Sequence, residues 1–126
     1  MDDLATLFAF YALFALFSTH ELDAIQRHEW RIFPITRRFA DEIAYPLFTA
    51  VHVPLYVLLL WLFFHPNPAI VQNSRAAFAA FAIIHAGLHW LLRHHPKYEF
   101  NNRFSWAIIL STAVVGLFYL LLAFAV

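Results

Sequence analysis

The stretch AYPLFTAVHVPLYVLLLWLFF, residues 44–64, decides the fold of this chain. Apart from its tyrosines, it contains a single ionisable side chain, His52. The hydrocarbon core of a bilayer is about 30 Å thick, and roughly 20 apolar residues in helical form are needed to span it. The stretch is long and apolar enough for this, so it predicts a transmembrane helix.

Three further stretches have the same character. Tyrosines aside, residues 4–19 carry no ionisable group, residues 76–92 carry only His85 and His89, and residues 104–126 carry none. The connections contain Pro34, Pro66, Pro68 and Pro96, and proline ends or prevents a helix. We therefore expect one all-α domain over residues 1–126, an up-down antiparallel four-helix transmembrane bundle with helices at about 4–30, 44–64, 76–93 and 104–126.

The composition excludes several classes of function. The chain is 63% hydrophobic, and a soluble domain of 126 residues could not bury so much apolar surface. Its formal net charge is zero, whereas nucleic-acid-binding domains carry a clustered basic face. The absence of cysteine removes disulfides, thiolate ligands and cysteine nucleophiles. We expect a membrane lipid or a lipid-soluble small molecule as the partner, and no nucleic acid.

Basic residues gather at one end of the predicted bundle. They follow the first helix or lie between the third and the fourth: Arg27, Arg31, Arg37, Arg38, Arg93, Lys97 and Arg103. The connection at the other end has only Arg75. Since basic residues are enriched on the cytosolic side of membrane proteins, we expect both termini to lie on the non-cytosolic side.

Ionisable side chains occur inside three of the four predicted helices at a similar depth. At 1.5 Å per helical residue, His20, His52 and His85 each lie ~12 Å inside the core, measured from the basic end. Such groups are rare and costly in a bilayer, and they can shield one another from lipid inside a bundle. We expect them to share one polar site near the cytosolic side.

The spacing of these residues favours metal binding. His20 and Asp23 are three residues apart, and His85 and His89 are four apart, so each pair lies on one stripe of its helix and can chelate one ion. The second predicted helix contributes His52, which lies beside Pro54. The missing N–H of this proline leaves a backbone carbonyl of the helix without its usual partner. The predicted metal ligands are His20, Asp23, His52, His85 and His89. The predicted catalytic residue is Glu21, a general base about 100° around the helix from His20.

Each of these residues also has a purely structural interpretation. Asp23 could bond to His20 and form an ion pair with Arg27, one turn further along. The two histidines of the third helix could bond separately to carbonyls or hydroxyls of neighbouring helices. Glu21 could form an ion pair with His28 or Arg31 near the interface.

Three classes of function fit this set of residues. Zinc or non-haem iron suits imidazole and carboxylate ligands, and either would make the chain a membrane metalloenzyme that hydrolyses or oxidises a lipid-soluble substrate. A haem-binding electron carrier, with haem b between His52 and His85, is an alternative. A non-catalytic proton-relay or scaffold subunit is another. Because the outer half of each helix is apolar, a complete proton path would need a homo-oligomer.

The first helix also carries a resemblance. The run His20-Glu21-Leu22-Asp23-Ala24-Ile25, followed by His28-Glu29-Trp30, resembles the H-E-x-D-A…E-W signature of small uncharacterised bacterial membrane proteins that look like relatives of the HXXEE family. The chain departs from the H-x-x-E-E motif at Asp23, which keeps the chelating spacing, and at Ala24, where the second acid is missing. The resemblance implies a bacterial inner-membrane location and a site, but names no reaction. It also raises Glu29 and Trp30 above a purely anchoring role.

Overall fold

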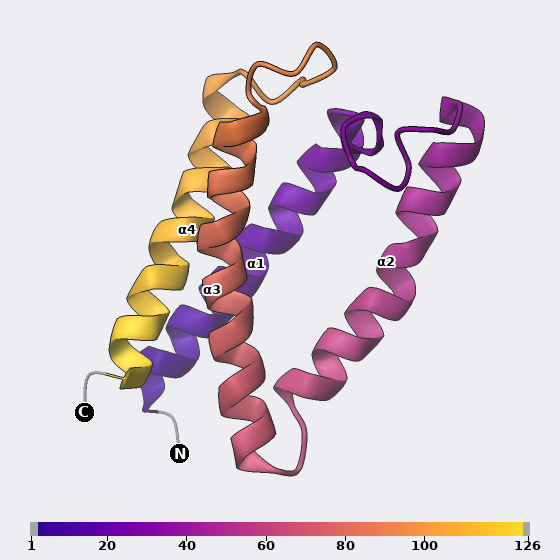
Figure 1. Cartoon of the computed structure of the whole chain (residues 1–126). Helices are drawn as coiled ribbons and strands as arrows, with labels where there is room; N and C mark the ends of the chain where they lie inside the picture. Colours follow the sequence, from indigo (N-terminus) through magenta and orange to yellow (C-terminus); the bar gives the residue numbers. More distant parts are fainter. Residues whose placement is uncertain (1–2, 125–126) are drawn as a thin grey trace.

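The structure is a computed structural model that describes residues 3–124. It contains four α-helices, α1 (Leu4–Gln26), α2 (Asp41–Phe63), α3 (Pro68–Leu92) and α4 (Arg103–Phe124), and one short 3-10 helix, η1 (Glu29–Arg31). All four α-helices are long and apolar enough to cross a membrane. They run alternately up and down, and the chain enters and leaves at the same end of the bundle (Figure 1). The predicted all-α four-helix fold is confirmed.

The helix boundaries differ from the expected ones where polar residues begin or end a helix. α3 begins at Pro68 rather than near residue 76, because Asn67 caps it by accepting the Ala69 N–H at 3.0 Å and proline suits a first helical position. α2 begins at Asp41, where carboxylates favour a helix N-terminus. α1 ends at Gln26 rather than near residue 30, and this change matters for the site.

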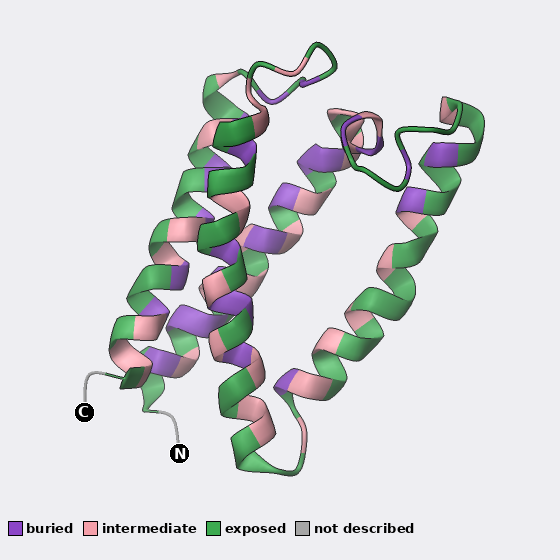
Figure 2. Cartoon of the chain, in the orientation of Figure 1, coloured by how far each residue is buried: buried purple, intermediate pink, exposed green. Residues whose placement is uncertain are grey.

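Three of the helices form the body of the bundle, and the fourth leans away from it. α1, α3 and α4 pack together, whereas α2 lies beside α3 at their connection and diverges from it toward the upper end in Figure 1. The buried residues of α2 are confined to its two ends: Ala44, Phe48 and Phe63. Its middle turns are largely exposed, as Figure 2 shows. α2 is therefore the least buried of the four helices that are apolar enough to cross a membrane.

Aromatic packing fills the end of the bundle that holds the termini. Phe63 lies 4.9 Å from Phe10 and 5.1 Å from Phe78 between ring centroids. α4 approaches α3 closely at Gly116, where an added Cβ would lie 2.9 Å from the carbonyl oxygen of Ala79. A second cluster, which includes Ala24, Tyr98 and Phe100, lies at the basic end. The polar site lies beside this second cluster.

Candidate metal centre

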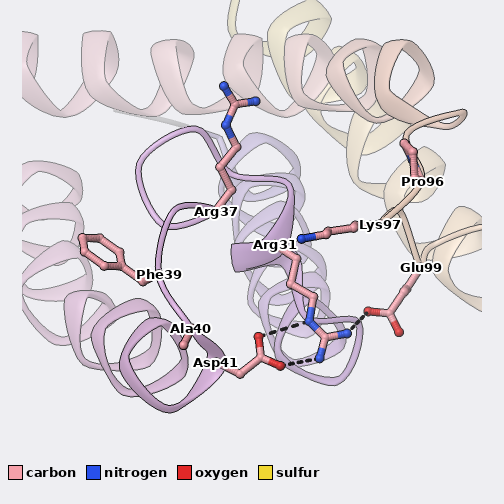
Figure 3. Close-up of a pocket in the computed structure, with 8 residues that line it drawn as sticks. All are labelled: Arg31, Arg37, Phe39, Ala40, Asp41, Pro96, Lys97 and Glu99. Carbon is pink, nitrogen blue, oxygen red and sulfur yellow. Dashed lines mark hydrogen bonds and ion pairs between the residues drawn. The ribbon is translucent and has the colours of Figure 1, made fainter.

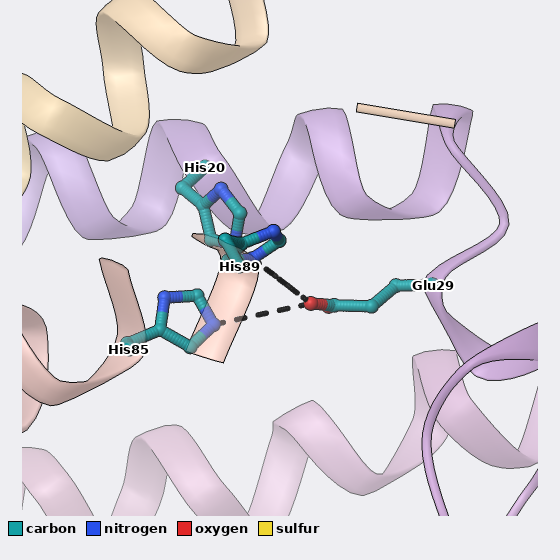
Figure 4. A group of neighbouring side chains, drawn as sticks. All are labelled: His20, Glu29, His85 and His89. Atoms are coloured by element: carbon teal, nitrogen blue, oxygen red, sulfur yellow. Dashed lines mark ion pairs between the residues drawn. The ribbon is translucent and has the colours of Figure 1, made fainter. Parts of the chain in front are cut away.

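The chain reverses direction just after α1. His28 adopts a left-handed conformation, with φ 52° and ψ 47°, in which histidine is several-fold enriched among non-glycine residues. η1 follows and is fixed by Trp30, which is buried against Phe48 of α2 and donates its indole N–H to Asp41 at 2.9 Å. The reversal turns the side chain of Glu29 back into the bundle (Figure 4).

Four side chains from three elements meet there: His20 of α1, Glu29 of η1, and His85 and His89 of α3. We call this group the His/Glu cluster. Each member offers one ligand atom, and these atoms all lie within 4.8 Å of one another. The Oε1 atom of Glu29 is 3.5 Å from Nε2 of His89, 3.9 Å from Nε2 of His85 and 4.0 Å from Nε2 of His20. Figure 4 shows the carboxylate facing the imidazoles.

The cluster is almost closed to the outside. His20 is 1% exposed and His89 3%, and the side chains of His85 and Glu29 are only slightly more open. Within residues 3–124, neither ring nitrogen of His20 has a hydrogen-bond partner. Buried polar groups in native proteins are nearly always hydrogen-bonded, and each exception needs an explanation such as an ion or a catalytic role. His20 is such an exception.

Tyr98 orients one of the imidazoles from outside the cluster. Its hydroxyl lies 2.9 Å from Nδ1 of His89, so the remaining nitrogen, Nε2, is the one directed at Glu29. Histidines that ligate metals usually use one nitrogen for the metal and the other for such a partner, which fixes the tautomer and the ring orientation. The ring of Phe100, 4.6 Å from that of His89, closes the same side.

The electrostatics of the cluster favour a charged carboxylate. Burial works against the ionised form of Glu29, but the contacts with His85 and His89 outweigh it and hold the pKa of Glu29 below its ordinary value. Burial, with the nearby charge of Glu29, raises the pKa of Tyr98, so its hydroxyl stays neutral. The cluster therefore offers three imidazoles and one anionic oxygen at neutral pH.

This set of donors could hold a metal ion. At metal–ligand distances of about 2.0–2.1 Å, the ligand atoms of a tetrahedral zinc site lie about 3.3 Å apart. The ligand atoms of the His/Glu cluster are somewhat further apart, so small side-chain shifts would bring them into range. Imidazole and carboxylate together suit zinc and non-haem iron equally well.

A family model matches residues 6–126, and its description is Family of unknown function (DUF6713). The chain belongs to this family. DUF6713 is uncharacterised, in agreement with what the resemblance implied, while the relation to the HXXEE family stays a prediction. No curated protein and no solved structure matches the chain.

Three of the five predicted ligands meet in the DUF6713 chain, and two lie elsewhere. His20, His85 and His89 form the cluster, whereas Asp23 accepts a hydrogen bond from the Ser105 hydroxyl of α4 at 2.5 Å and pairs with Arg27 at 3.3 Å. Asp23 is three residues from His20 and so about 60° around the helix, which is enough to face α4 instead of α3. The ion pair with Arg27 is the structural role considered for it above.

His52 and Glu21 form a second polar contact, separate from the His/Glu cluster. Nε2 of His52 lies 2.6 Å from Oε2 of Glu21, and Nδ1 of His52 lies 2.7 Å from the carbonyl oxygen of Phe48. Glu21 therefore pairs with His52 of α2 and not with His28, the partner considered from the sequence. Both groups are largely buried, with 12–13% of each side chain exposed.

Sequence reasoning missed Glu29 as a potential ligand. A helix that continued to residue 30 would carry Glu29 ~13 Å along the axis from His20, out of reach of the shared site. The left-handed His28 and η1 shorten that separation. The only signal in the sequence was the E-W part of the signature, at Glu29 and Trp30. Tyr98, in the connection between α3 and α4, had no signal of its own.

Proposed function

We propose that the chain is an integral membrane metalloprotein in which His20, Glu29, His85 and His89 hold zinc or non-haem iron. The observation that carries this proposal is the buried imidazole of His20, which has no hydrogen-bond partner within residues 3–124 and faces three other potential ligands. Intramembrane ionisable groups are costly, and a bound cation would account at once for three histidines of the helices and for the buried Glu29 of η1. Asp23 and His52 are left out of this ligand set because their polar atoms are engaged elsewhere.

The reaction class we propose is hydrolysis or oxidation of a lipid-soluble substrate. Zinc would supply activation of water for hydrolysis, and iron would supply redox chemistry. The residues of the chain would act around that centre: Glu29 contributes negative charge, and Tyr98 fixes the orientation of His89. Glu21 is the proposed general base; because it pairs with His52 outside the His/Glu cluster, a water or the substrate itself would have to link its carboxylate to the metal, and His52, at 2.6 Å, would share the proton that Glu21 accepts.

Two alternatives are distinguished by the Glu21–His52 contact. Haem b between His52 and His85 is less well supported, because both nitrogens of His52 already have partners at 2.6 and 2.7 Å. A proton-relay subunit is better supported, since a carboxylate and an imidazole at hydrogen-bond distance can pass a proton. A complete relay would still need further polar residues, which a homo-oligomer joined through the exposed middle of α2 would have to supply.

We further propose a location in the bacterial inner membrane with both termini outside the cytosol. The basic residues of the connections after α1 and between α3 and α4 support this orientation. It would put the His/Glu cluster toward the cytosolic side. The relation to the HXXEE family is part of the same proposal, and it rests on the signature alone.

Elemental analysis of detergent-purified protein tests the metal proposal. We expect about one transition-metal ion per chain after purification without chelators, and loss of that metal in His89→Ala. His94→Ala is the matched control, because His94 is an exposed histidine just beyond α3 and outside the cluster. A content under about 0.2 ions per folded wild-type chain, or equal loss in both variants, would overturn the proposal.

A further inference from the structure

A pocket of about 530 Å³ opens at the basic end of the bundle, next to the His/Glu cluster but separate from it. It lies between the segment that follows η1 and the connection between α3 and α4. Its charged wall is formed by Arg31, Arg37, Asp41, Lys97 and Glu99 (Figure 3). These side chains come from two parts of the chain that are far apart in sequence.

The two acidic groups of the pocket share one guanidinium. Arg31 contacts Asp41 through Nη2 at 2.5 Å and through Nε at 3.2 Å, and its Nη1 lies 3.5 Å from Glu99. Glu99 also lies 2.8 Å from Nδ1 of His28. Figure 3 shows Arg31 held between the two carboxylates. An anion entering the pocket would therefore meet acids whose negative charge is offset in part by Arg31.

Two of the three cationic side chains that line the pocket are not engaged by its carboxylates. Within residues 3–124, Arg37 and Lys97 make no ion pair, and both are exposed. Three cationic and two anionic side chains line the pocket, which leaves one net positive charge. Arginine and lysine are the usual partners of phosphate oxygens, so a phosphate group is the ligand that this charge and these donors favour.

The segment between η1 and α2 points to a lipid as the source of that phosphate. It carries three exposed apolar side chains outside any α-helix, Phe33, Ile35 and Phe39, interspersed with Arg37 and Arg38. Phe39 itself lines the pocket. Apolar side chains beside cations are typical of a segment that lies in the membrane interface among lipid headgroups.

We propose that this pocket binds the phosphate of an anionic glycerophospholipid, with Arg37 and Lys97 as its partners and Phe39 against the start of the acyl chains. The pocket and the His/Glu cluster share no lining residue, but they are close in sequence, because Arg31 follows Glu29 by two residues and Glu99 follows Tyr98, the partner of His89. The additional statement that this lipid class is the substrate rests on the function proposed above. The binding itself does not.

Lipid titrations of the delipidated, detergent-purified chain test the proposal. The probes are a short-chain phosphatidylglycerol, a phosphatidylcholine of the same chain length, and glycerol phosphate. We expect saturable binding of phosphatidylglycerol, with at least tenfold lower affinity in the Arg37→Gln/Lys97→Gln double variant. Arg38→Gln is the control for a general effect of charge, since it removes one positive charge from a neighbouring exposed position outside the pocket.

The titrations test the pocket and the assignment of its ligand to a lipid separately. Unchanged phosphatidylglycerol affinity in the folded double variant, equal loss in Arg38→Gln, or equal binding of phosphatidylcholine would overturn the pocket. Glycerol phosphate binding as tightly as the lipid would overturn the assignment to a lipid. Metal content is measured in the same samples and should match the wild type in every variant. If the wild type binds lipid but no metal, the metal proposal fails and the lipid site stands.

Discussion

Replacing Tyr98 by phenylalanine removes one hydroxyl next to the His/Glu cluster and leaves the ring in place. The hydroxyl lies 2.9 Å from Nδ1 of His89, and the residue is 8% exposed, so water cannot readily take over the contact. The ring packs 5.3 Å from Phe100 between centroids, and phenylalanine keeps that packing. The change therefore isolates the orientation of one proposed ligand.

The expected effect of Tyr98→Phe is weaker metal binding with little loss of fold. Removing a hydrogen-bonded partner of a metal-bound histidine typically lowers metal affinity about 10–100-fold, or about 1.4–2.8 kcal/mol. The lost hydrogen bond alone should reduce stability by only about 0.5–1.5 kcal/mol. Titration with a metal-binding competitor dye measures the first quantity, and thermal unfolding in detergent the second.

Tyr45→Phe is the control for Tyr98→Phe. Tyr45 is a half-exposed tyrosine near the start of α2, outside the His/Glu cluster. The Tyr45→Phe variant should bind metal with the affinity of the wild type. Unchanged metal affinity in a folded Tyr98→Phe variant would refute the role of Tyr98, and an equal loss in Tyr45→Phe would show that the assay reports a general effect of losing a tyrosine hydroxyl.

Three further predictions concern the residues around the site. Asp23→Ala should lower stability by about 1.5–3 kcal/mol, because Ser105 and Arg27 lose a charged partner, but it should leave metal content unchanged; loss of metal would return Asp23 to the ligand set. Gly116→Ala should destabilise the fold by about 1–3 kcal/mol, since its Cβ would lie 2.9 Å from Ala79 O, whereas Gly87→Ala, whose Cβ would meet no neighbouring element within 4 Å, should be neutral or slightly stabilising in thermal unfolding. Metal affinity should fall as the pH is lowered, because protons compete with the metal for the imidazole ligands, while the lowered pKa of Glu29 keeps its carboxylate charged; affinity that is flat from pH 8 to 5 would argue against histidine ligands.

The four-helix fold could be predicted from the length of the apolar runs and from the prolines in the segments between them. Residues 44–64 are long and apolar enough for a spanning helix, and the four helices alternate in direction because the connections between them are short. The helix boundaries at Asp41 and Pro68 were harder to predict from the sequence, because polar residues extend these helices beyond their apolar runs. These extensions depend on capping and on charge at the helix N-terminus.

The candidate site was predictable only in part, for geometric reasons. Helical spacing brings His85 and His89 to one stripe, and matched depth relates them to His20. Which neighbour each stripe faces depends on how the helices rotate and tilt, and this turned Asp23 toward α4. Glu29 required the reversal at His28, which is stabilised by contacts with residues far along the chain, such as the one to Glu99.

The identity of the atoms around a bound metal tests the account most directly. X-ray absorption spectroscopy of the protein loaded with zinc should give a shell of three imidazole nitrogens and one or two oxygens at about 2.0–2.1 Å. In Glu29→Gln the contribution of the carboxylate should be lost while the three imidazoles remain. A shell made only of oxygens, or one with fewer than two imidazoles, would contradict the assignment of His20, His85 and His89 to one metal centre.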